Sequence, residues 1–181
     1  MKRTIISAAL LSSFFIGANA FAAGPDDSGI LEITGRVVGT TCQFVDGNSA
    51  EINLNDVGAN VFNNMNAGDI YNGVTQGTSV PLKIQCEPGK TPHISFSTTQ
   101  FDGNDITLNN GSATGVGFAV FYGDVNKQVS PNSTDPNKAI ILAPTTDGIY
   151  NLNFLARYAR TAGTVNAGDV KSTLTLTVVT E

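Results

Sequence analysis

Residues 29–42 have the sequence GILEITGRVVGTTC, which is the most informative stretch for the fold. Every second residue from position 31 to position 37 is apolar or glycine, and the residues between them are polar. Because successive side chains of a strand point to opposite faces, this pattern predicts a β-strand with one buried and one wetted face. Such a strand needs a sheet to join. The stretch ends at Cys42, the first of two cysteines.

The first 22 residues have the features of a secretory signal peptide. The basic pair Lys2 and Arg3 precedes an apolar run at positions 4–16, and small residues follow around Ala20 and Ala22. This arrangement predicts export, with cleavage after Ala20 or Ala22. No later stretch has the roughly 18 apolar residues that a transmembrane helix requires. We therefore expect residues 1–22 to be removed and the remaining chain to form one domain, with no direct membrane insertion.

The composition fits an ordered β-rich domain and excludes some classes of function. The sequence is 41% hydrophobic and has 19 glycines, which suits short strands joined by many turns. A net charge of −5, with only 14% charged residues, provides no basic surface for nucleic acid. Cys42 and Cys86 are an even pair in an exported chain, which predicts a disulfide between them.

Alternation with a period of two recurs along the chain, and helical periodicity is hard to find. The alternating runs lie at residues 80–86, 116–122, 152–158 and 172–180. In the last run Leu174, Leu176 and Val178 share one face and threonines occupy the other. Turn signals rich in Asn, Asp and Gly separate the runs, and residues 55–77 are expected to form a long connection with a helical turn near residues 61–65. Short strands at this spacing predict an all-β sandwich.

The sequence offers no set of residues for catalysis or metal binding. His93 is the only histidine, and its place at the start of an expected strand favours a surface or edge position. The GxSxG, HExxH and SxxK motifs are absent. The acidic cluster at residues 102–105 lacks the distal glutamate of a calcium loop, so a hairpin turn explains it better. We expect no enzyme activity and no cofactor.

Four tyrosines leave a carbohydrate-binding β-sandwich open as an alternative, because aromatic rings stack on sugar rings. They are Tyr71, Tyr122, Tyr150 and Tyr158. The sequence has no tryptophan, and Tyr122 and Tyr158 share the parity of expected core positions. Packing within the domain is therefore the favoured explanation for these rings.

The place of the opening strand in the chain raises the question of where it pairs. Its simplest interpretation is a first strand in its own sheet, and periodicity alone does not exclude this. However, Gly35 interrupts its apolar face, and a second β-run at residues 39–45 follows after too short a join for an easy reversal. Pairing outside its own domain is the second interpretation.

Several segments together resemble the subunits of chaperone-usher fimbriae, the type 1 and P pilus family of Gram-negative bacteria. They are the signal peptide, the GxLxIxGxVVxxxC stretch at residues 29–42, the second cysteine in residues 80–86, the strand at 116–120, residues 152–158 followed by NAGD at 166–169, and the threonine-rich final run. Each segment is a weak signal alone, but in this order and spacing they are specific. The resemblance covers most of the chain after the signal peptide.

The resemblance implies an all-β, incomplete immunoglobulin-like β-sandwich, with residues 23–38 as an N-terminal donor-strand extension and residues 39–181 as the pilin domain. A groove beside the last strand would be filled first by a periplasmic chaperone and then by the extension of a neighbouring subunit. The implied donor residues are Gly29, Leu31, Ile33, Gly35 and Val37. The implied groove and chaperone-binding residues are Leu174, Leu176, Val178 and Thr180.

Three residues carry further implications of the same resemblance. Gly35 would enter a pocket that admits no larger side chain and so would set the register of the donor strand. The disulfide between Cys42 and Cys86 would join two strands near the groove and stiffen it. Thr180 departs from the family pattern, which has an aromatic residue one position before the end, and this weakens the implied chaperone contact there.

The function implied by the resemblance is that of a structural subunit of a surface fimbria, which polymerises head to tail and supports adhesion. The implied partners are identical or related fimbrial subunits, a periplasmic chaperone and an outer-membrane usher. The chain would pass through the periplasm to the cell surface. A shaft subunit is favoured, with a minor adaptor subunit as the alternative. A tip adhesin is disfavoured because it would carry a further receptor domain and lack the donor extension.

Overall fold

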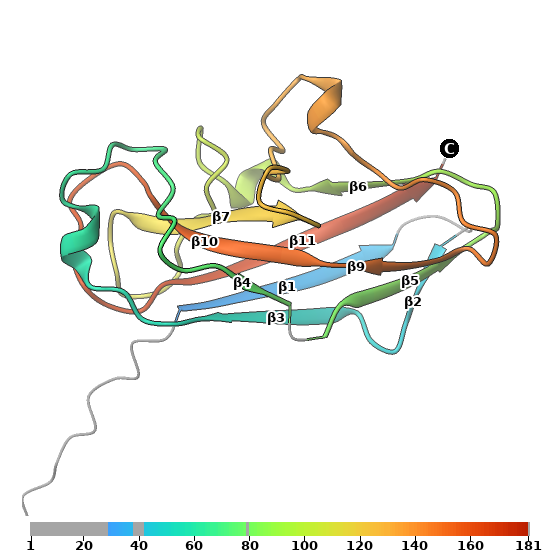
Figure 1. Cartoon of the computed structure of the whole chain (residues 1–181), viewed down its shortest axis with the longest axis horizontal. Helices are drawn as coiled ribbons and strands as arrows, with labels where there is room; N and C mark the ends of the chain where they lie inside the picture. The colour runs from blue at the N-terminus through green and yellow to red at the C-terminus, as the bar shows by residue number, and fades with distance from the viewer. Residues whose placement is uncertain (1–28, 38–41, 79, 181) are drawn as a thin grey trace, which may run out of the picture.

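The computed structural model of the protein describes residues 29–37, 42–78 and 80–180 (Figure 1). These residues form eleven β-strands and three short 3₁₀ helices, without an α-helix. The strands lie in two layers packed face to face, as in an immunoglobulin-like sandwich (Figure 1). The predicted all-β sandwich is therefore confirmed. The expected signal peptide, residues 1–22, and residues 23–28 and 38 of the expected extension lie outside the described residues.

One layer is a five-stranded sheet with the order β3-β1-β11-β6-β8. In that order its strands are Ser49–Leu54, Gly29–Val37, Lys171–Thr180, Pro92–Phe96 and Ile140–Ile141. The other layer holds two three-stranded sheets, β4-β10-β7 and β2-β5-β9. Their strands are Gln76–Gly77, Phe154–Arg160 and Val116–Tyr122 in the first, and Cys42–Val45, Leu82–Cys86 and Ile149–Leu152 in the second. The 3₁₀ helices η1, η2 and η3 span Ala59–Phe62, Thr98–Gln100 and Pro136–Lys138.

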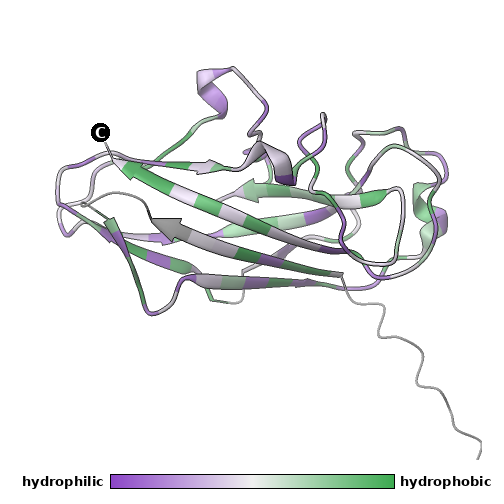
Figure 2. Cartoon of the chain, turned by 180° about the vertical axis from the view of Figure 1, so that it is seen from behind, coloured by the Kyte–Doolittle hydropathy of each residue, from purple (hydrophilic) through white to green (hydrophobic). Residues whose placement is uncertain are grey.

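Most strands bury alternate residues, as the sequence pattern predicts. Along β11 the inward residues are buried and the intervening threonines are exposed or half-buried, and the alternation is visible as a change of hydropathy along the strand (Figure 2). The run that includes β9 and β10 behaves in the same way, with its alternate residues Leu152, Phe154, Ala156 and Tyr158 all buried. These faces meet between the two layers and form the main core.

Strand β7 departs from this pattern because it is buried on both faces. On its second face Ala119 and Phe121 pack against Ile106 of the segment that precedes the strand. In the same segment the Thr107 amide donates a hydrogen bond to the Phe118 carbonyl at 2.9 Å. A Cβ atom at Gly117 would lie 2.3 Å from the Thr107 carbonyl oxygen. The glycine therefore lets this covering segment approach the strand closely.

The long connection at residues 55–77 contains one 3₁₀ turn, η1, slightly earlier than the predicted turn at residues 61–65. It also contains a feature that the sequence did not predict, the two-residue strand β4, which pairs with Leu155 and Ala156 of β10. A strand of two residues, Gln76 and Gly77, is too short to show an alternating pattern in the sequence. It is recognised only by its pairing with β10.

The predicted disulfide between Cys42 and Cys86 is present. The two residues are direct partners in the antiparallel pair of β2 with β5. The bridge spans 44 residues of sequence, and closing a loop of that length stabilises a chain by about 4 kcal/mol in the chain-entropy model. It fixes β2 firmly in the second layer.

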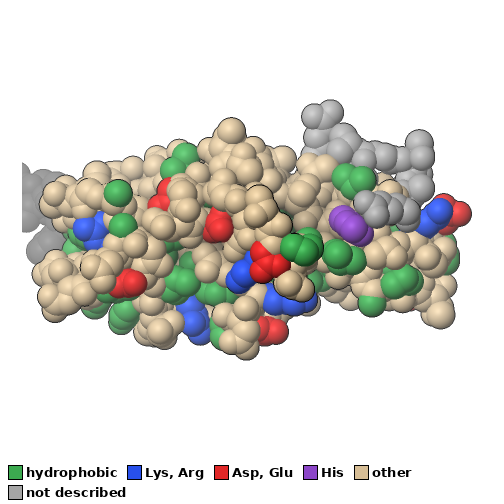
Figure 3. Space-filling view, turned by 90° about the horizontal axis from the view of Figure 1, so that it is seen from above, with side chains coloured by type: hydrophobic (Ala, Val, Ile, Leu, Met, Phe, Trp, Pro, Cys, Tyr) green, Lys and Arg blue, Asp and Glu red, His purple; other side chains and the backbone are tan. Residues whose placement is uncertain are grey.

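His93 lies near the start of a strand, as predicted, but that strand is an interior one, and the acidic cluster at residues 102–105 forms the predicted turn. His93 is half-buried in β6, between Val179 of β11 and Ile141 of β8, and Figure 3 shows the histidine among hydrophobic side chains. The Asp102 carboxylate accepts hydrogen bonds from the Asn104 and Ile106 amides, which closes a turn.

Candidate functional site

The opening strand of the sequence, β1, lies inside the five-stranded sheet of its own chain, between β3 and β11 (Figure 1). It pairs antiparallel with β3 on one side and parallel with β11 on the other. Every other strand pairing in the described part of the chain is antiparallel. In the single chain, therefore, the strand occupies its own sheet, which is the simpler of the two interpretations of the sequence.

The inward face of β1 closes the core between β3 and β11. Leu31 and Ile33 are both fully buried, with 0% of their surface exposed. Ile33 lies opposite Leu174 of β11 and Ala50 of β3. The Thr34 hydroxyl also donates a hydrogen bond to the Leu174 carbonyl at 3.2 Å. Without β1, the space between β3 and β11 would be an apolar groove with two unpaired strand edges.

The structure brings the implied donor residues together on this one strand. Gly29, Leu31, Ile33 and Gly35 follow one another along its inward face. The backbone of Val37 pairs with Val178 at the end of the β1–β11 ladder. The side chain of Val37 lies outside the described part of the structure.

Three of the four implied groove residues lie on β11 next to β1. Leu174, Leu176 and Val178 are buried and pair in register with β1. Thr180 lies beyond the end of the β1 ladder, where it pairs with Pro92 of β6. The groove beside β1 therefore includes the first three residues, and Thr180 belongs to the neighbouring strand pair.

Each glycine of β1 faces an aromatic ring from the opposite layer. A Cβ atom at Gly35 would lie 2.3 Å from Cζ of Phe44 in β2, and one at Gly29 would lie 2.4 Å from the hydroxyl oxygen of Tyr158 in β10. Real Cβ atoms essentially never come that close to another atom. Sequence reasoning did not assign Phe44 or Tyr158 to the groove. The signal that could have suggested Tyr158 was its parity with core residues.

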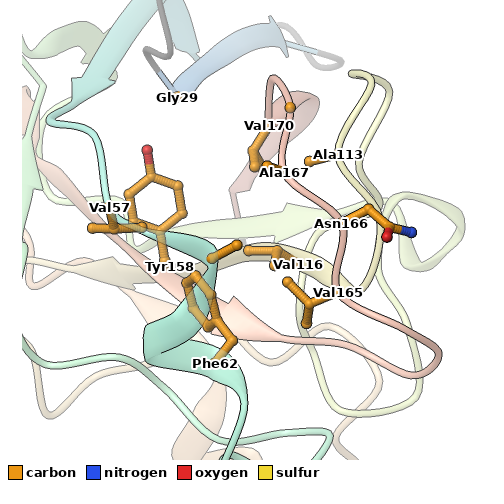
Figure 4. A pocket seen from close by; sticks show the side chains of 12 residues that line it. Gly29, Val57, Phe62, Ala113, Val116, Tyr158, Val165, Asn166, Ala167 and Val170 are labelled. Atoms are coloured by element: carbon orange, nitrogen blue, oxygen red, sulfur yellow. The ribbon is translucent and has the colours of Figure 1, made fainter.

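Tyr158 stands at the Gly29 end of the groove, beside a small cavity that Phe62, Val116 and Val170 also line (Figure 4). Its hydroxyl points toward Gly29 (Figure 4). Burial and the negative charge of Asp56 raise the pKa of the Tyr158 phenol, and a hydrogen bond with the Gly29 backbone lowers it in part. The side chain is therefore a neutral phenol at physiological pH, held at the first residue of β1.

The outward face of β1 contains an unfavourable contact. Glu32 lies directly opposite Glu51 of β3, and both side chains are exposed. Like charges directly opposite each other in a strand pair repel. Among the side chains that the structure describes, the one ion pair is between Lys83 and Asp46, so none of these side chains forms a salt bridge with either glutamate.

The described residues contain no group of three or more His, Cys, Asp or Glu side chains that could hold a metal ion. Within the same residues, no helix has the length and hydrophobicity of a membrane span. The four tyrosines pack within the domain. Tyr150 and Tyr158 are buried, Tyr71 packs against the main core beside Phe62, and Tyr122 packs against Phe154.

Two comparisons with known proteins overlap this site. The model of the fimbrial protein family matches residues 31–180. The chain is also 36% identical over 183 residues to the uncharacterized fimbrial-like protein YehD of Escherichia coli strain K12, and the match covers 98% of each chain. The family match begins at Leu31, within β1, and includes all of β3 and β11, the strands on either side of β1.

Proposed function

Because this chain belongs to the fimbrial protein family, we propose that it is a shaft subunit which polymerises by inserting β1 into the groove of a second copy. Membership of this family implies assembly with other fimbrial subunits in a surface appendage and points to a non-enzymatic, structural protein. The proposal concerns how the subunits are joined. In it, the strand that fills the groove of each subunit comes from its neighbour.

The observation that carries the proposal is the position of β1. It is an interior strand whose inward residues Leu31 and Ile33 are fully buried, yet among the described elements it is the first, joined to the others only through residues 38–41. A strand with one covalent connection can leave its own groove and enter an identical one without unfolding the remaining strands. The groove of the second copy offers the strand the same hydrogen-bond partners and the same apolar surface.

The interface would be strong and repeated. Burying Leu31 and Ile33 contributes about 1.5–3 kcal/mol for each side chain, before the entropy cost of association. The strand also brings main-chain hydrogen bonds with both β3 and β11. Because donor and acceptor surfaces lie at different places on each subunit, the contact does not close on itself and produces a filament.

Before assembly, a subunit would need a periplasmic chaperone and an outer-membrane usher as partners. A subunit with an empty groove exposes apolar residues of β11 and two strand edges, which invites aggregation. A periplasmic chaperone would fill the groove during transit, after export directed by residues 1–22. An outer-membrane usher would then catalyse the exchange, and the fibre at the cell surface would support adhesion.

A minor adaptor subunit is the alternative within the same mechanism, because it also needs both a donor strand and a groove. The carbohydrate-binding alternative has no specific observation in its favour, since the tyrosines that suggested it pack within the domain.

The test is assembly of the full chain with its chaperone and usher, followed by negative-stain microscopy and gels of unheated and heated samples in SDS. We expect filaments, and polymer bands that resist SDS until they are heated. Deletion of residues 23–38 or the substitution Gly35→Leu should abolish these polymers, whereas the outward-facing control Glu32→Gln should keep them. Normal fibres from the deletion variant would contradict the proposal.

A further inference from the structure

The chain makes a short turn at residues 72–75, on the outer side of the second layer. Before the turn, the Tyr71 amide donates a hydrogen bond to the Tyr158 carbonyl of β10 at 2.8 Å. After the turn, β4 pairs with the same strand. The turn begins with the pair Asn72 and Gly73, and both residues are exposed. An accessible Asn-Gly pair therefore lies in a turn that is fixed to β10 at both ends.

Arg157 of β10 holds the side chain of this asparagine. Its Nη1 atom donates a hydrogen bond to Oδ1 of Asn72 at 2.8 Å, and its Nε atom donates one to the Thr75 hydroxyl at 2.6 Å. The guanidinium carbon also lies over the ring of Phe121, 5.6 Å from its centroid. These three contacts fix the guanidinium, so a permanent positive charge lies at the side-chain carbonyl oxygen of Asn72.

The amide of Gly73 is available as a nucleophile. In the described part of the chain it donates no backbone hydrogen bond. Glycine has no side chain to hinder approach to its own nitrogen. The fold also favours glycine here, because the Tyr71 ring occupies the place that a Cβ atom at position 73 would take. The residue type that best permits attack on Asn72 is thus the one that the packing requires.

We propose that Asn72 is a modification site, at which the folded protein deamidates itself. The Gly73 nitrogen attacks the side-chain carbonyl carbon of Asn72, and the new nitrogen–carbon bond closes a succinimide ring. The bond from that carbon to the side-chain nitrogen breaks, and the nitrogen leaves as ammonia with the proton that Gly73 gives up. Water then opens the ring at either carbonyl and yields aspartate or isoaspartate. Water is the only co-reactant.

Arg157 assists this reaction through the atom on which charge develops. During the attack the side-chain carbonyl oxygen of Asn72 becomes negative, and a donor already aimed at that oxygen stabilises the transition state. Nη1 of Arg157 has this position before the reaction starts. When the ring opens to aspartate, the new carboxylate lies beside the same guanidinium and can form a charge-assisted hydrogen bond with it.

The other Asn-Gly pair of the sequence, Asn110 and Gly111, provides a control within the same molecule. The Gly111 amide donates a hydrogen bond to Oδ1 of Asn109 at 2.8 Å, and the Asn110 amide donates one to the Lys171 carbonyl at 2.7 Å. A Cβ atom at Gly111 would also strike the carbonyl oxygen of Asp169. Ring closure at Asn110 would have to break these hydrogen bonds, so we expect it to be slow.

The experiment incubates the folded full chain at mildly alkaline pH and follows both asparagines by peptide mass spectrometry. Asn72 should react about tenfold faster than Asn110, because Gly111 must first give up its hydrogen bond. Arg157→Met keeps the apolar stem and removes the charge, and it should slow the reaction at Asn72 by about tenfold. Thr75→Val, which removes the acceptor that holds Nε, should slow it less. Neither variant should change the rate at Asn110.

Equal rates at the two asparagines of the native chain would overturn the modification site. A rate at Asn72 that Arg157→Met leaves unchanged or raises, with Asn110 unaffected, would overturn the role of the guanidinium. If Arg157→Met loosens the fold, both asparagines react faster and the melting temperature falls, and Thr75→Val then decides that role. The inference does not depend on assembly, so its failure and the failure of the proposed function are separate results.

Discussion

Strands β1 and β10 hold similar places in the two layers but are attached to the domain in different ways. Each lies between two partners and buries large apolar residues completely, Ile33 in β1 and Phe154 in β10. Strand β10 is antiparallel to both neighbours and continues from β9 after a single residue, Asn153. Strand β1 is parallel to β11 and is joined to the rest of the described chain only through residues 38–41.

Burial alone therefore does not make a strand a permanent part of its domain. Withdrawing β10 would break the second layer into separate pieces and expose the core from within. Withdrawing β1 opens one groove in the first layer and leaves the second layer paired. Changes in β10 should therefore affect folding itself, whereas changes in β1 should separate the folding of the domain from its ability to donate a strand.

The largest effect is expected from Phe154→Ala in β10. Phe154 is fully buried and packs against Phe96 and Tyr122, with ring centroids 5.6 and 5.5 Å away. Loss of this side chain should lower the free energy of unfolding by about 3–5 kcal/mol, which denaturant unfolding measures. The variant should fail both as donor and as acceptor. If it unfolds like the native chain and still assembles, β10 is not the permanent strand that we describe.

Ile33→Ala in β1 should cost about 2–5 kcal/mol of monomer stability and should separate the two roles. Without the isoleucine side chain, β1 fills a groove poorly. The groove of the same chain, formed by β3 and β11, stays intact. Mixed with native subunits during assembly, the variant should shorten the fibres because it accepts a strand normally and donates its own strand poorly. Fibre lengths in micrographs test this, with Glu32→Ala on the outward face as the matched control. Unchanged lengths at equal mixing would show that donation does not depend on this buried residue.

Thr107→Val tests the acceptor groove, because Thr107 contacts β11, one of the two strands beside β1. The Thr107 hydroxyl is buried, lies 2.7 Å from the Ser172 hydroxyl of β11, and accepts a hydrogen bond from the Phe118 amide. The valine leaves that amide without its partner, so stability should fall by about 1–3 kcal/mol. Because the groove itself is unchanged, the polymers should form and lose stability to denaturant. Full loss of polymers with a folded monomer would place Thr107 in the exchange step instead.

The smallest effect is expected from Glu51→Gln, which removes the repulsion between Glu51 and Glu32. The monomer should become more stable by about 0.2–1 kcal/mol, and the gain should shrink at high salt because exposed charges are screened. Release of β1 from its own groove should become slower. Thermal unfolding at low and high salt measures the first effect, and Glu87→Gln, an exposed glutamate outside the strands, is the control. An equal gain in stability from Glu87→Gln would show that the effect does not come from relief of the repulsion between Glu51 and Glu32.

The sequence allowed the strands and the disulfide to be predicted because these depend on local patterns. Alternation in residues 152–158 and 172–180 gives the buried face of β10 and β11, and the exported pair Cys42 and Cys86 gives the bridge. Strand β4 was missed because its partner β10 is distant in sequence. The double burial of β7 was missed because the preceding segment around Ile106, which packs on its second face, shows no alternation of its own.

The groove was predicted only in part for the same reason. Periodicity shows that Leu31 and Ile33 need burial, but it carries no information on the direction of pairing or on which copy supplies the core. The glycines were visible in the sequence as gaps in the apolar face. The aromatic residues opposite them, Phe44 and Tyr158, became apparent only when the two layers were placed together.

The most direct test of an exchangeable β1 is to lock it in its own groove. Glu32 and Glu51 are exposed direct partners on β1 and β3, and the spacing of such partners suits a disulfide. The double variant Glu32→Cys/Glu51→Cys should therefore form a second bridge. Native chain treated with the same mild reductant, and each single cysteine variant, are the controls. We predict that the oxidised double variant stays monomeric and that reduction restores polymers which resist SDS until heated. Equal polymer yields from the oxidised and reduced forms would contradict the exchange of β1 between subunits.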